Sequence, residues 1–185
     1  KDPEKPTIKL IEPENGDSIK PSDKEGIHFE VEFADNEALG SYKVNIHPAF
    51  DGHTHEQAAP QFAAGDSIAF EKTWLESEFI AAGEQSIEGK RNVTIHHHKI
   101  VIPTAVNGKP LKEGNYHFMV TCSDKARNET FVARNIKILY SAKEHDHEHE
   151  HEHSHGHGHH HGHDHDDSKA VIFYIAGLVL YIIGM

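Results

Sequence analysis

The chain has 185 residues, 26% of them charged, and a formal net charge of −12 at pH 7 with histidine neutral. This acidic balance argues against nucleic acid as a partner, because phosphate binding needs lysine and arginine to release counterions. The single cysteine, Cys122, excludes an internal disulfide and a cysteine-based zinc knuckle, so metal chemistry would have to use nitrogen and oxygen ligands.

The composition divides the chain into three parts. Residues 1–143 have the common size of one folded domain. They are followed by a low-complexity tract rich in His, Asp and Glu at 144–169 and by an uncharged apolar segment at 170–185. The chain opens with KDPEKPTI and no methionine. We therefore expect a mature exported segment, with an export signal and a lipid-bearing cysteine upstream.

Short runs that alternate apolar and polar residues recur through residues 1–143, separated by Gly, Pro, Asn and Asp. Long stretches with a helical period are missing, so the pattern predicts an all-β fold, an immunoglobulin-like or fibronectin-like antiparallel β-sandwich of about seven strands. In chain order the expected strands are 7–13, 26–35, 40–50, one centred on 68–74 inside a long loop, 91–103, 114–124 and 129–140.

One expected strand, at 91–103, changes the parity of its apolar residues between Ile95 and Ile100. A β-bulge, or a crossing of the strand between two sheets, would explain such a switch. The histidine triplet His96 to His98 lies at this point.

The segment LKEGNYHFMVTCSDKARNETFVARNIKI has the form L-x-x-G-x-Y-x-F-x-V-x-x-x-D-x-x-x-N. It resembles the end of many bacterial immunoglobulin-like and fibronectin-like domains, and the resemblance gives Tyr116 the place of a tyrosine that hydrogen-bonds across a corner. Together with PTIKLIEP, the segment from Asp35 to His47, FDGHTHE and HHHKIVIP, it makes residues 6–140 resemble a family of Bacteroidetes lipoproteins of unknown function with an Ig-like domain. The resemblance implies an exported cell-envelope protein and brings no activity.

Residues 144–167 contain twelve histidines interleaved with eight acidic residues. Neutral imidazole donates a nitrogen lone pair to zinc, copper or nickel, and carboxylates add oxygen ligands and attract cations. A segment of this composition cannot bury a core, so we expect a disordered arm with many weak, exchangeable metal sites. A solvated spacer is the alternative reading. The candidate ligands in the tract are His145, His147, His149, His151, His153, His155, His157, His159, His160, His161, His163 and His165.

Eight more histidines lie in residues 1–143 and are also candidate ligands: His28, His47, His53, His55, His96, His97, His98 and His117, with Asp51 and Glu56 as oxygen ligands or supporting partners. Side chains alternate along a strand, so each H-x-H pair can point one way and chelate an ion. We favour the pair His53 and His55 together with the triplet. A lone outward histidine such as His28 or His117 has an ordinary solvated polar residue as its alternative.

An Ig-type topology also predicts how these histidines group. The third and sixth strands are neighbours in that topology, which would place His47 and His117 on one sheet face beside the loop that carries His53 and His55. The second and fifth strands are neighbours too, which would bring His28 near His96 or His98 on the other sheet.

The apolar segment 170–185 would form a helix of about 24 Å, short of the roughly 30 Å hydrocarbon layer. It could span a thinned bilayer, lie in the interface or continue beyond the sequence given. We expect membrane association, in the periplasm or at the outer membrane.

Motifs for enzyme chemistry are missing: the sequence has no H-E-x-x-H, no G-x-S-x-G and no Gly-rich phosphate loop. We therefore expect a non-catalytic cell-envelope protein that binds and sequesters or hands over a transition metal. Zn²⁺ is the first choice, with Cu²⁺ or Ni²⁺ as alternatives, and a membrane metal transporter or receptor is the expected partner. The alternative is an adhesion or interaction module for a protein or glycan, with the tract as a spacer.

Overall fold

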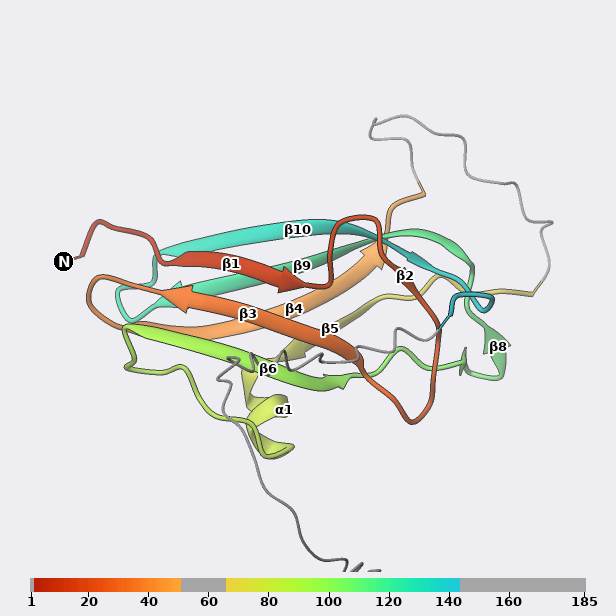
Figure 1. The fold of residues 1–185 in the computed structure, drawn as a ribbon, viewed down its shortest axis with the longest axis horizontal. Helices are drawn as coiled ribbons and strands as arrows, with labels where there is room; N and C mark the ends of the chain where they lie inside the picture. The colour runs from red at the N-terminus through yellow and green to blue at the C-terminus, as the bar shows by residue number, and fades with distance from the viewer. Residues whose placement is uncertain (1, 51–65, 144–185) are drawn as a thin grey trace, which may run out of the picture. The chain divides into compact units, whose positions relative to one another are not determined.

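The structure is a computed structural model, and it describes residues 2–50 and 66–143. These residues belong to one compact unit, residues 1–146. Figure 1 shows that the unit is built almost wholly from β-strands, which form two facing layers. The all-β class and the antiparallel β-sandwich are therefore confirmed.

The first sheet has three antiparallel strands in the order β1-β3-β6. Its strands are β1 (Thr7–Glu12), β3 (Ile27–Ala34) and β6 (Asn92–Ile100). The second sheet has five strands in the order β2-β10-β9-β4-β5, of which only the β2–β10 pair is parallel. Its strands are β2 (Ser18–Ile19), β4 (Leu39–Pro48), β5 (Lys72–Leu75), β9 (Gly114–Asp124) and β10 (Glu129–Ile138).

All seven predicted strands are present, as β1, β3, β4, β5, β6, β9 and β10. The neighbours that were expected, the second strand with the fifth and the third with the sixth, are paired in the structure as β3 with β6 and β4 with β9. The sequence did not predict the two-residue strands β2, β7 (Ala105–Val106) and β8 (Lys109–Pro110), of which the last two pair with each other. Strands of this length have no periodicity to read.

Alternation along the strands sends one set of side chains between the sheets. On β3 the buried residues are Phe29, Val31 and Phe33; on β9 they are Tyr116, Phe118, Val120 and Cys122. Each large apolar side chain that is fully buried contributes about 1.5–3 kcal/mol relative to exposure. The histidines and acids between these positions therefore face outward.

The helix α1 (Glu76–Ala81) follows β5 directly and lies in a region that the sequence predicted to be a loop with one strand. Its first turn is capped because Glu78 Oε2 accepts a hydrogen bond from the Leu75 N–H. Phe79 is 1% exposed, and its ring stacks on Tyr42. Six residues are too few to show a helical period, which explains why the pattern missed this helix.

Tyr116 fixes the corner before β9. Its hydroxyl donates a hydrogen bond to the Lys112 carbonyl at 2.6 Å and accepts one from the Phe70 N–H at 3.2 Å. This is the corner hydrogen bond that the resemblance implied for Tyr116.

None of the helices in the described part of the chain is long and apolar enough to cross a membrane. Residues 170–185, where we expect membrane association, lie outside the described residues.

Candidate metal centres

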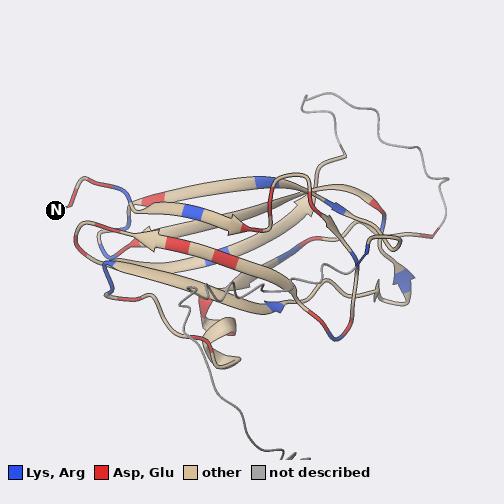
Figure 2. Ribbon diagram, in the orientation of Figure 1, with Lys and Arg blue, Asp and Glu red and all other residues tan. Residues whose placement is uncertain are grey.

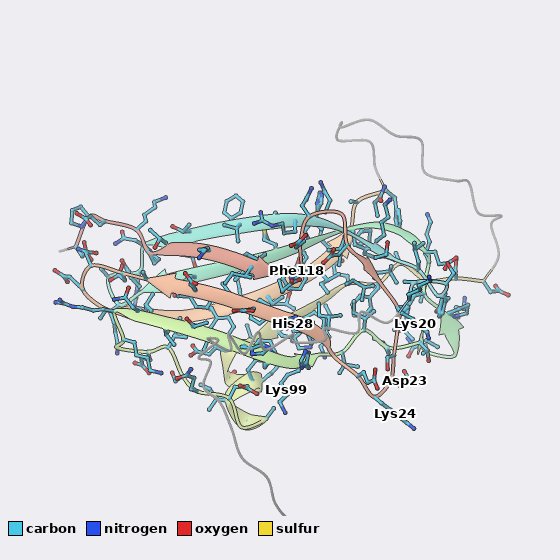
Figure 3. The ribbon with its side chains drawn as sticks, in the orientation of Figure 1. Lys20, Asp23, Lys24, His28, Lys99 and Phe118 are labelled. Carbon is cyan, nitrogen blue, oxygen red and sulfur yellow. The ribbon has the colours of Figure 1, made fainter. Side chains whose placement is uncertain are left out.

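Three histidines gather on the outer face of the three-stranded sheet, and we call them the histidine trio: His28 on β3 with His96 and His98 on β6. One ring nitrogen of each lies within 4.8 Å of the other two. The ring centroids of His28 are 4.7 Å from those of His96 and 5.1 Å from those of His98. Figure 3 labels His28 on its strand, with Lys99 of the neighbouring strand close by. The predicted approach of His28 to the triplet is therefore seen in the fold.

A β-bulge lies beside the trio. The register between β3 and β6 shifts between Ile27 and Phe29, so that Phe29 pairs with His97 while Ile27 pairs with Ile100. The bulge predicted from the parity switch is thus confirmed. The two positions His98 and Lys99 on β6 lie opposite the single position His28 on β3.

Gly26 allows the bulged strand to come close. A Cβ atom at this position would lie 1.9 Å from the His98 carbonyl oxygen, a distance that backbone atoms cannot relieve without moving β6. Only glycine fits beside the trio here.

A tetrahedral zinc ion with nitrogen ligands at 2.0–2.1 Å needs those nitrogens about 3.3 Å apart. The nitrogens of the trio, within 4.8 Å of one another, are near this separation. His96 and His98 are exposed and can rotate, whereas His28 is partly buried and provides the fixed member. The carboxylate of Glu30 lies 3.9 Å from His28 Nε2 and adds an oxygen donor, which the sequence analysis did not select.

His97, although it belongs to the triplet, does not join the trio. It is 5% exposed and points between the sheets, with its ring 5.0 Å from that of Phe29 and 4.6 Å from that of Phe79. Burial lowers the pKa of His97 to about 4, and its Nδ1 accepts a hydrogen bond from the Lys99 N–H. His97 is therefore a neutral side chain of the core.

The second cluster is the histidine pair, His47 on β4 and His117 on β9, on the outer face of the five-stranded sheet. The two residues are direct cross-strand partners. Their nitrogens, His47 Nε2 and His117 Nδ1, lie 3.4 Å apart, almost the separation of two ligands on one tetrahedral zinc ion. The predicted pairing of His47 with His117 is seen in the fold.

Asn45 orients the pair. Its side-chain Oδ1 lies 2.5 Å from His47 Nδ1 and accepts a hydrogen bond from that N–H. The lone pair of His47 is therefore on Nε2, the nitrogen that faces His117. Asn45 is itself held, because its Nδ2 donates to Thr73 Oγ1 at 2.8 Å. A hydrogen bond to the far nitrogen is how proteins hold a metal-binding tautomer of histidine.

Several predicted ligands lie outside the described residues. These are His53, His55, Asp51 and Glu56 in the segment that follows β4 in the sequence, and all twelve histidines of the tract. The trio and the pair are on different sheets, so the five described histidines other than His97 form two separate groups.

Among known families, one described as a domain of unknown function, DUF4625, matches residues 1–139. The chain belongs to this family. The expected resemblance to a domain family of unknown function is confirmed to that extent. No curated protein and no solved structure matches the chain.

The DUF4625 domain also holds a cluster that the sequence analysis missed, made by Asp2, Asp35 and Asp124. The signals were present, since Asp35 directly follows β3 and Asp124 ends β9 four residues before Asn128. Asp35 and Asp124 were predicted only as the last residues of their strands, because residues so far apart in the chain give no sign of meeting.

Proposed function

We propose that this protein is a non-catalytic, cell-envelope metal-binding protein that captures a transition metal, zinc first, and hands it over. The observation that carries the proposal is the gathering of five described histidines into two outward-facing clusters, the trio and the pair. Imidazole nitrogens suit Zn²⁺, with Cu²⁺ and Ni²⁺ as alternatives.

The two clusters have complementary chemistry. In the pair, His47 has its tautomer set by Asn45 and its nitrogen at a ligand-to-ligand distance, so little reorganisation is needed. In the trio, two exposed rings can close on His28, and Glu30 stands ready as a fourth donor. Water can fill the remaining positions in both clusters, which favours exchange over permanent storage.

The tract supplies the other half of the mechanism. Its twelve histidines and eight acids offer many ligands at high local concentration next to the domain. Ions gathered there would pass to the trio, to the pair or to a membrane transporter. Metal would load at neutral pH and leave as imidazoles protonate in acid.

We further propose that the protein is an exported lipoprotein held at the membrane in the periplasm or at the outer membrane. The sequence resemblance and the apolar residues 170–185 support this placement.

The test uses the full chain with the twelve tract histidines changed to Gln, named here the tract-Gln variant. It is purified without an affinity column, freed of metal with a chelator and titrated with ZnCl₂ by calorimetry at neutral pH. We expect zinc binding at the domain. The double change His28→Gln with His96→Gln should remove one class of site, and His47→Gln should remove another.

Matched controls sit on the same faces. Thr94→Gln places an amide on the trio's face of β6, and Thr121→Gln does so on the pair's face of β9, four residues from His117; both should leave the zinc isotherm unchanged. If the tract-Gln variant takes up no zinc, or if all histidine variants bind like the controls, the domain sites do not exist. The protein- or glycan-binding alternative would then stand.

A further inference from the structure

Three aspartates meet between the two sheets at the end of the sandwich where the N-terminus lies. Asp2 precedes β1, Asp35 follows β3, and Asp124 is the last residue of β9. One carboxylate oxygen of each lies within 4.8 Å of the other two. Figure 2 shows acidic residues in the N-terminal segment and in the loop after β3, at the same end.

All three side chains are more than nine-tenths buried: Asp2 is 6% exposed, Asp35 8% and Asp124 5%. Within residues 2–50 and 66–143, no lysine or arginine forms an ion pair with any of them. Three carboxylates this close repel one another, and burying them without a cation is costly.

Hydrogen bonds hold the carboxylates of Asp2 and Asp35 in place through one oxygen each, and the other oxygen of each has no hydrogen-bond partner among the described residues. Asp2 Oδ1 accepts from the Glu4 N–H and from Asn36 Nδ2, while its Oδ2 is buried and has no partner among the described residues. Asp35 Oδ2 accepts from the N–H groups of Glu37 and Ala38, and its Oδ1 is likewise buried without a partner.

Asp124 is braced by a single residue, Asn128. Its Oδ1 accepts from the Asn128 N–H at 2.7 Å, and its Oδ2 accepts from Asn128 Nδ2 at 2.6 Å. Asn128 Nδ2 also donates to the carbonyls of Asp2 and Glu4, which ties the N-terminal segment to β9. Carboxylate oxygens have more than one lone pair, so Asp124 keeps capacity for a cation.

We propose that Asp2, Asp35 and Asp124 form a calcium site that clamps the N-terminal segment and the two sheets together. Ca²⁺ binds oxygen at 2.3–2.6 Å, so two of its ligands can lie as much as about 5.2 Å apart, and the three oxygens, within 4.8 Å of one another, fall inside that range. Ca²⁺ also tolerates irregular geometry, whereas Mg²⁺, at 2.0–2.1 Å, demands a near-ideal octahedron. The all-oxygen donor set also separates this site from the histidine clusters.

The test compares thermal unfolding of the full chain in EGTA and in about 5 mM CaCl₂, a concentration suited to extracellular calcium modules. We expect calcium to raise the Tm of the wild-type protein by about 5 °C. Asp35→Asn and Asp124→Asn should lose most of this rise. In EGTA Asp35→Asn should be at least as stable as the wild type, because the amide removes repulsion and its oxygen can still accept both existing hydrogen bonds. Asp124→Asn loses one of the two acceptors that Asn128 uses, so it is judged by its calcium response, the difference in Tm between CaCl₂ and EGTA.

Asp2→Asn is the variant that cannot fail through misfolding of a strand, since residue 2 lies before β1, and it too should lose the calcium response. Asp23→Asn is the matched control: Asp23 also accepts a backbone N–H, from Thr104, but is exposed and outside the cluster, so its calcium response should equal that of the wild type. An unchanged Tm on calcium addition, or an equal rise in all four variants, would overturn the proposal. An equal or larger rise with MgCl₂ would overturn the assignment to calcium. The histidine variants described above do not touch this site, so the two proposals fail independently.

Discussion

His47 and His117 face each other across β4 and β9, with His47 Nε2 3.4 Å from His117 Nδ1. The hydrogen bond from His47 Nδ1 to Asn45 sets which nitrogen is available. The pair is therefore prepared for a shared ion before any ion arrives.

The orienting role of Asn45 can be measured. Asn45→Ala removes the acceptor for His47 Nδ1, and the loss of such a supporting partner typically lowers metal affinity by about 10- to 100-fold. We expect a drop of this size for the pair, measured by zinc competition in the tract-Gln variant that also carries His28→Gln.

Ser41→Ala is the control for Asn45→Ala. It removes another outward hydrogen bond of the same strand, between Ser41 and Ser123, away from the pair. Zinc affinity should not change. Equal affinities for Asn45→Ala and Ser41→Ala would show that Asn45 does not position His47.

His97 predicts a pH dependence of stability in metal-free protein. Its pKa is lowered to about 4 by burial, whereas an unfolded chain has a histidine pKa of about 6.5. The unfolded state therefore binds this proton more readily, so the stability is complete above pH 6.5 and is lost as the pH falls toward 4. The loss should be on the order of 2 kcal/mol between pH 7 and pH 4.5.

Urea unfolding of the tract-Gln variant in EDTA checks this, with the fluorescence of buried Trp74 as the signal. His97→Leu should flatten the pH dependence, and His96→Gln, at an exposed neighbour, should keep it. If His97→Leu shows the same slope as the parent, burial of His97 is not its cause.

Tyr116→Phe should destabilise the domain by about 1–3 kcal/mol, because the Phe70 N–H and the Lys112 carbonyl both lose their hydroxyl partner. Chemical unfolding at neutral pH measures the loss. Phe131→Tyr adds a hydroxyl at a side chain that is 66% exposed, so it should change stability very little. Equal stability of Tyr116→Phe and wild type would show that the hydrogen bonds of the Tyr116 hydroxyl do not stabilise the fold.

Cys122 should be chemically inert in the folded protein. Burial, reinforced by the negative charges of Asp35, Glu76 and Asp124, raises its pKa to about 12, so little reactive thiolate exists at neutral pH. Reaction with Ellman's reagent should be at least about 100-fold slower than in urea. An exposed cysteine made by Ser41→Cys in a Cys122→Ala background should react quickly, and a fast native reaction of Cys122 would contradict its placement.

The strands could be predicted because a sheet with one buried face has an apolar residue at every second position of each strand, as at Phe29, Val31 and Phe33. The bulge near the triplet was readable for the same reason, since it breaks that period between Ile95 and Ile100. The helix α1 was not, because Phe79 is its only buried apolar residue.

By itself the sequence determined the strands of the sandwich and the supply of imidazole ligands, because alternation and composition are local properties. Tertiary structure alone decided that His97 turns into the core while His96 and His98 stay outside, since the bulge sets the phase of that strand. It also decided that Asp2, Asp35 and Asp124 converge. These three residues come together only when the two sheets and the N-terminal segment pack against one another at one end of the sandwich. A local sequence pattern carries no information on such packing.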